Sequence, residues 1–159
     1  MARKIKAGKF KYTLETVLKV RGIREKKEQE KFAEKNREYI KEKKKEDELR
    51  DEKKDQENTL RKVFKSGPIS DFGEVMRRHS HLGILKEDIE KQVEKVIDAS
   101  KKLEKQREQL VKSMKDKKIM EKDKDNTKKK HTKLMQDLEL KFLDEIATQR
   151  FQRDQREKS

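Results

Sequence analysis

The sequence predicts an all-α protein in which two long helices form an antiparallel coiled coil with a short, partly helical tip. Charged residues fill 50% of the 159 positions and hydrophobic residues only 29%, which leaves too little apolar surface for a layered core. The charge content would also suit a disordered chain. However, the chain has one proline and five glycines, whereas disordered segments are usually rich in both, and Lys, Glu, Leu and Arg favour helix.

One stretch interrupts the helical pattern. At Ser66, Gly67 and Pro68, a residue that tolerates positive φ precedes one that cannot continue a helix, which is the expected order at a helix C-terminus. We expect helix one to run from about Lys11 to Lys65 and helix two from Ile84 to Arg153. The predicted parts are residues 1–65, a basic N-terminal arm with helix one; residues 66–83, a tip connection with a helical piece between Gly73 and Gly83; and residues 84–159, helix two with a C-terminal overhang.

Helices of this length can cover their apolar side chains only against each other, so each should carry a heptad repeat. In helix one the repeat begins at Leu14 and ends at Val63, with 7 of 15 positions apolar. In helix two 9 of 17 positions are apolar, in a frame that starts with Ile89, Val93, Val96, Ser100, Leu103, Arg107, Leu110 and Met114. An antiparallel register in which facing position numbers add to 149 fits both frames, and it pairs Leu14 with Met135, Tyr39 with Leu110 and Leu60 with Ile89.

The first predicted turns of helix one are the most informative part of the chain. Phe10, Leu14, Val17 and Leu18 have the spacing of one helical face. We expect helix two to bury this face.

The residues that enzymes and metal sites need are scarce. The chain has no cysteine, and His79 and His81 stand two residues apart, which points them to different sides of a helix. No glycine-rich phosphate loop is present, and a pair of helices offers no cleft in which to desolvate carboxylates. We therefore predict no catalytic residues, no metal and no cofactor. No apolar run approaches the roughly 20 residues that cross a bilayer, so we expect a soluble intracellular protein.

Positive charge is concentrated in two regions. The net charge is +14; residues 1–30 hold ten Lys and Arg against four Glu, and residues 115–133 hold nine Lys against four acidic residues. The predicted hairpin brings both regions to one end. Such a surface would bind nucleic acid non-specifically or an acidic protein surface. A basic coiled-coil adaptor that binds RNA or ribosomes is thus one candidate function.

Two segments resemble the FliJ family, small coiled-coil proteins of the flagellar type III export apparatus. The first is Phe10-Lys11-Tyr12-x-Leu14-Glu15-x-Val17-Leu18-x-x-Arg21, and the second is Leu143-Asp144-Glu145-Ile146-Ala147 followed by Arg150. The resemblance implies a non-enzymatic stalk, without cofactor, that couples a hexameric export ATPase to a membrane export gate and assists export chaperones. It also implies a cytoplasmic protein, peripherally associated with the inner membrane at the flagellar base.

The resemblance further implies two sets of binding residues. The residues expected to contact the ATPase ring are Phe10, Leu14, Leu18, Arg21, Phe142, Asp144, Glu145, Ile146 and Arg150. Those expected to contact the export gate are His81, Leu82, Leu85 and Ile89. No metal-binding residues and no specific nucleic-acid contacts are implied.

Overall fold

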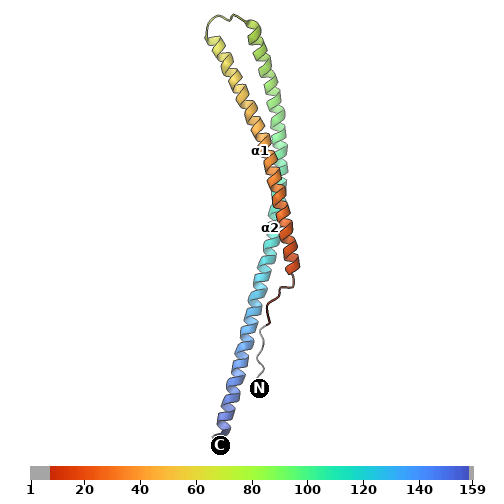
Figure 1. The fold of residues 1–159 in the computed structure, drawn as a ribbon, viewed down its shortest axis with the longest axis vertical. Helices are drawn as coiled ribbons and strands as arrows, with labels where there is room; N and C mark the ends of the chain where they lie inside the picture. The colour runs from red at the N-terminus through yellow and green to blue at the C-terminus, as the bar shows by residue number, and fades with distance from the viewer. Residues whose placement is uncertain (1–7, 158–159) are drawn as a thin grey trace. The chain divides into compact units, whose positions relative to one another are not determined.

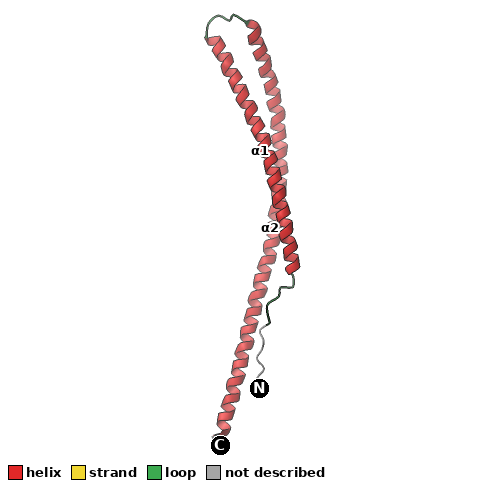
Figure 2. Ribbon diagram, in the orientation of Figure 1, coloured by secondary structure: helices red, strands yellow, loops and turns green. Residues whose placement is uncertain are grey.

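The computed structural model describes residues 8–157, which form two long helices and no strand. Helix α1 is Glu15–Lys65 and helix α2 is Phe72–Glu157, with 51 and 86 residues (Figures 1 and 2). This confirms the predicted all-α fold. The first seven residues of the predicted basic arm and the last two of the C-terminal overhang lie outside the described residues. Within residues 8–157, neither helix contains a stretch apolar enough to cross a membrane.

The connection between the helices is short and locally encoded. At the end of α1 the Ser66 amide donates to the carbonyl of Lys62 at 3.1 Å, and Gly67 has a φ of 117°. Ahead of α2, Asp71 caps the helix by accepting a hydrogen bond from the Glu74 amide at 3.1 Å. Helix α1 therefore ends at Lys65, where the sequence predicted.

Helix α2 begins earlier than predicted, at Phe72 instead of Ile84. The helical piece expected between Gly73 and Gly83 is thus the beginning of α2 itself. The Asp71 cap supplies a start signal, and a single glycine such as Gly83 costs a helix only about 1 kcal/mol. The buried side chains of Val75 and Leu85, on either side of Gly83 in the sequence, show that this part of α2 is packed.

The contacts divide the chain into two compact units, to which each helix contributes. Unit 2 comprises residues 25–113 and unit 1 comprises residues 1–24 and 114–159. In unit 2, α1 and α2 run side by side in opposite directions from the six-residue connection 66–71 (Figure 1).

Two glutamines of α2 fix the register of unit 2. The Gln92 amide donates to the backbone carbonyl of Glu42 at 2.9 Å and to its carboxylate at 2.7 Å. Two heptads along both helices, Gln106 repeats the arrangement at Glu28, with distances of 3.5 and 2.5 Å. Each glutamine amide binds both acceptors of one facing residue, so a shift of one helix along the other by part of a turn would break both hydrogen bonds.

These contacts correct the predicted register. The position numbers of Gln92 and Glu42 add to 134, and so do those of Gln106 and Glu28, instead of 149. Tyr39 is therefore level with Lys95, fifteen residues before its predicted partner Leu110. The predicted pair of Leu60 with Ile89 is wrong for the same reason. The predicted pair of Leu14 with Met135, in unit 1, is wrong because the adjacent Glu15 contacts Lys124.

The short connection explains the correction. Residues 65 and 72, which flank it, add to 137, whereas the ends of the predicted tip, 66 and 83, add to 149. The error in the predicted start of α2 therefore also produced the error in the predicted register. The apolar pattern could not detect the error, because charged residues fill so many heptad positions that a shift of about two heptads still pairs apolar side chains.

The heptad frame predicted for α1 is confirmed, because every position except Leu14 is at least partly covered. In α2 one half of the frame is confirmed, by the buried or half-buried Ile89, Val96, Leu103 and Leu110. In the other half Val93, Met135 and Phe142 are half-buried as predicted, but Ser100, Arg107 and Met114 are exposed. The protected residues at those three places are Ala99, Gln106 and Ser113, each one position earlier.

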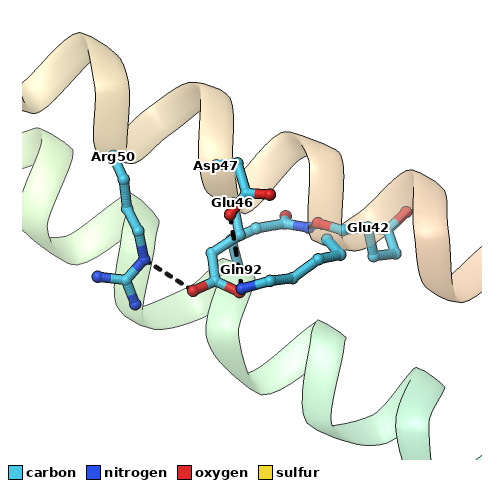
Figure 3. Close-up of polar contacts among 6 residues, drawn as sticks. Glu42, Glu46, Asp47, Arg50 and Gln92 are labelled. Atoms are coloured by element: carbon cyan, nitrogen blue, oxygen red, sulfur yellow. Dashed lines mark hydrogen bonds and ion pairs between the residues drawn. The ribbon is translucent and has the colours of Figure 1, made fainter.

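A buried carboxylate lies in the interface of unit 2. Glu46, 5% exposed, accepts from Arg50 Nε at 2.7 Å and from Lys43 Nζ at 3.0 Å (Figure 3). Arg50 first and Lys43 second hold the pKa of Glu46 below its usual value. Gln92, followed by Lys45, lowers the pKa of the neighbouring Glu42 in the same way. The two carboxylates can therefore stay ionised between the helices.

Candidate protein-docking site

The segment ahead of α1 is attached to α2 by two aromatic side chains. The Phe10 ring lies against the His131 ring, with centroids 5.5 Å apart and planes tilted by 58°. The Tyr12 hydroxyl donates to the Asp123 carboxylate at 2.6 Å, and Tyr12 is 8% exposed. This hydrogen bond raises the pKa of Tyr12 to about 12. The described part of unit 1 therefore begins with a non-helical segment that is held against α2.

Polar contacts continue this attachment into the first turns of α1. Lys124 Nζ lies 2.6 Å from the Glu15 carboxylate, and Arg21 Nη1 donates to the backbone carbonyl of Asp116 at 2.7 Å. The guanidinium of Arg21, a predicted ring-binding residue, thus also holds the hairpin together. Leu18 is half-buried in the same unit.

Beside these contacts, several apolar side chains remain exposed. Leu14 and Val17 are each about two-fifths exposed, and Val20 and Ile23 more than half. The expectation that α2 buries Leu14 and Val17 is therefore wrong. The reason is geometric: the register brings Leu18 and Arg21 toward α2, which turns Val17 and Val20 outward.

The end of α2 in unit 1 continues past the beginning of α1 and carries a second exposed apolar set (Figure 1). Leu134, Leu140, Leu143 and Phe151 are all more than half exposed, Phe151 by 64%. Isolated exposed leucines are ordinary, but repeated ones on a helix segment without a packed partner helix mark an interaction surface.

The predicted ring-binding residues of α2 all lie in this segment. Phe142 and Ile146 are half-buried, and Asp144, Glu145 and Arg150 are exposed. All nine residues expected to contact the ATPase ring belong to unit 1. The structure thus brings both sequence motifs into one unit, although Phe10 and Arg21 also have partners within the chain.

The predicted gate-binding residues belong to unit 2, and their environments differ. His81 Nε2 lies 3.3 Å from the Glu52 carboxylate, and Leu82 is half-buried. Leu85 and Ile89 are buried in the helix interface, with Leu85 only 3% exposed. Packing between the helices explains the burial of Leu85 and Ile89. Of the four predicted gate residues, only His81 and Leu82 therefore present surface to a partner.

Sequence reasoning missed several of the exposed apolar residues, chiefly Val20, Ile23, Leu134 and Leu140. The signal was present: each is apolar yet falls outside the heptad frame. In a predicted coiled coil, an apolar residue off the frame is a candidate for contact with another molecule.

Lysines also gather on α2 in unit 1. Lys128, Lys129 and Lys130 are exposed, and none of them has an ion pair within residues 8–157. A solvent-open hollow of about 610 Å³ has Lys128, Lys129 and Lys133 in its lining. No group of acidic and histidine side chains in the described part of the chain is arranged to hold a metal ion. This side of unit 1 suits a negatively charged partner.

The comparisons with known proteins agree with this architecture. CT670 of Chlamydia trachomatis, a proposed YscO homolog, matches the fold with a TM-score of 0.62 and 24% sequence identity, over 91% of this chain and 96% of that chain. No curated protein matches the sequence. The family model described as the flagellar FliJ protein matches residues 10–156, which include the exposed apolar residues of both helices in unit 1. The chain therefore belongs to the FliJ family.

Proposed function

We propose that the chain is a non-enzymatic stalk of the flagellar protein export apparatus. It couples a hexameric export ATPase to the membrane export gate and assists export chaperones, at the cytoplasmic side of the inner membrane. Family membership supports the setting, and the exposed apolar residues of unit 1 support the docking role.

The ATPase ring contacts unit 1 in this proposal. The contact surface combines Val17, Val20 and Ile23 of α1 with Leu143 and Phe151 of α2. These side chains do not hold the hairpin together, so a partner can cover them without opening it. Asp144, Glu145 and Arg150 lie between Leu143 and Phe151 in the sequence and provide the polar part of the surface, and half-buried Phe142 and Ile146 add to its apolar part.

The gate contacts unit 2 through His81 and Leu82, which are the accessible members of the predicted gate set. Leu85 and Ile89 support them from the interface beneath. Export chaperones bind the same apparatus, but no feature of the described residues singles out a chaperone site.

The test is stimulation of the purified hexameric ATPase by the full chain. Leu143→Asp with Phe151→Asp should abolish stimulation and weaken association roughly 100-fold, because burying each side chain contributes about 1.5 kcal/mol or more. Both side chains are more than half exposed, so the helical circular dichroism should not change.

The matched control places the same charges on exposed apolar residues of unit 2. Ile40→Asp with Ile97→Asp should leave ATPase stimulation intact, because both residues belong to unit 2 and lie outside the proposed ring contact. Both side chains are about half exposed, so the substitutions match the test pair in exposure. Equal loss in both double variants would contradict the assignment of the ring contact to unit 1.

The exposed lysines 128–130 support a second candidate, a basic adaptor that binds RNA or ribosomes. In that case Lys128→Gln, Lys129→Gln and Lys130→Gln together should strongly reduce RNA affinity and its salt dependence. If ATPase stimulation also survives the Leu143 and Phe151 substitutions, the adaptor replaces the stalk as the function.

A further inference from the structure

The connection at the end of unit 2 exposes large apolar side chains that the hairpin does not need. Phe64, Ile69, Phe72 and Met76 are all exposed, Phe72 by 67%. Packing between the helices near the connection is instead provided by Val75, which is buried, and by half-buried Leu60 and Val63. The proposed contacts with ATPase and gate leave these four exposed residues without a role.

The same connection carries uncompensated positive charge. Arg61, Lys62 and Lys65 are exposed and form no ion pair with any residue from 8 to 157. The two acidic residues nearby are already paired: Asp71 lies 3.7 Å from Arg77, and Glu74 lies 2.7 Å from Arg78. The surface around residues 61–76 is therefore both apolar and cationic.

We infer that this connection docks on an anionic lipid surface. Basic residues near such a membrane are attracted to its headgroups, while exposed apolar side chains enter the headgroup boundary. Lysine and arginine side chains can extend toward phosphates while their aliphatic parts stay beside apolar neighbours.

The extent of the patch favours lipid over an acidic protein groove. On α2 the exposed apolar residues of this patch are Phe72 and Met76, roughly 6 Å apart along the helix, and exposed His79 and Ser80 interrupt the apolar stripe before the next exposed apolar residue, Ile84. Apolar faces that lie on membranes enter them by about 5 to 10 Å. A helix that docks in a protein groove usually continues its apolar stripe for several turns, which this one does not.

The chain contains no tryptophan, so a single introduced one reports on its own surroundings. Full-length protein with Phe72→Trp should show a blue-shifted emission on addition of vesicles made of equal parts phosphatidylcholine and phosphatidylserine. It should show no shift with phosphatidylcholine alone. Phe151→Trp, similarly exposed but in unit 1, is the matched control and should not shift with either vesicle.

A second arm separates local from overall attraction, because the whole chain carries a net charge of +14. Arg61→Gln, Lys62→Gln and Lys65→Gln together should weaken binding to the anionic vesicles roughly 100-fold, since each cation near the surface contributes about five-fold. Lys128→Gln, Lys129→Gln and Lys130→Gln remove the same charge from unit 1 and should change binding only a few-fold.

Three results would overturn the inference. One is an emission shift in the Phe151→Trp protein but not in the Phe72→Trp protein. Another is an equal or larger loss of vesicle binding in the triple variant at 128–130. The third is absence of vesicle binding while Phe64→Ser with Phe72→Ser abolishes binding to the gate protein, which would make the connection a protein-docking surface. None of these outcomes bears on ATPase stimulation through unit 1.

Discussion

Replacing Leu85 with alanine should destabilise unit 2 by about 2–3 kcal/mol. Leu85 is the least exposed of the buried hydrophobic residues, at 3%. The substitution removes three carbons, which at about 0.8 kcal/mol each gives roughly 2.4 kcal/mol of lost burial. Two opposing corrections nearly cancel. Alanine stabilises the helix by a few tenths of a kcal/mol. The cavity left by the leucine destabilises it by a similar small amount, because water reaches a two-helix interface from both sides and can fill the space.

The neighbouring Ile84 provides the control, because its side chain is 56% exposed. Ile84→Ala loses only part of this burial and gains helix propensity, so its effect should stay within about 0.5 kcal/mol. The two substituted residues are adjacent in the sequence, but one is buried in the interface and the other is exposed.

Urea unfolding measures this difference in a Tyr12→Phe background, where emission from Tyr39 reports on unit 2 alone. The midpoint for Leu85→Ala should fall by roughly 1 M relative to Ile84→Ala, given typical slopes for small domains. Equal midpoints would show that Leu85 does not pack between the helices. Such a result would also make Leu85 available for the gate contact that the family resemblance implies.

Three further outcomes follow from individual groups. The ion pairs of Glu46 lower its pKa from 4.5, so their stabilisation is present above pH 4.5 and is lost as the pH falls below it. Glu46→Gln should therefore make the urea midpoint less dependent on pH in that range. A pH profile unchanged by the substitution would contradict these ion pairs. In a Tyr39→Phe protein, tyrosinate absorbance should show Tyr12 titrating near pH 12, and Asp123→Asn should return its pKa toward 10.0. The stabilisation from this hydrogen bond is present below pH 10.0 and is lost as the pH rises toward 12. A titration midpoint near 10.0 before the Asp123 substitution would refute the hydrogen bond. Gly67→Ala should lower the free energy of unfolding by about 1–3 kcal/mol, because Gly67 has a positive φ. Gly83→Ala should instead stabilise α2 by up to about 1 kcal/mol, because the space for a Cβ atom is open. Equal changes in the thermal melts of the two variants would exclude this turn geometry.

The fold class and the end of α1 were predictable because they depend on local chemistry. Composition alone excludes a layered core, and Gly67 before Pro68 ends a helix wherever it occurs. The start of α2 was less predictable. Its signal is a single capping residue, Asp71, whose role competes with the helix-weakening glycines Gly73 and Gly83. The register error followed from this one boundary.

The candidate site was predictable in its location but not in its exposure. The two FliJ-like motifs indicated which segments matter, and both lie in unit 1. Which side chains remain exposed depends on the register, since a shift along α2 changes the residues that face Leu14 and Val17. Residues on the same turn, such as Leu18 and Val20, therefore acquired opposite environments that their apolar character alone could not distinguish.

The interface of unit 2 suggests why so many apolar side chains remain outside it. Gln92 and Gln106 set the register through hydrogen bonds to facing glutamates, and Glu46 keeps its charge between the helices. Buried polar pairs of this kind add little net stability, but a register that leaves them unpaired is strongly disfavoured. Specificity of pairing thus comes from polar residues. Apolar residues off the frame, such as Val20 and Phe151, are then free to contact other molecules without competing for the partner helix.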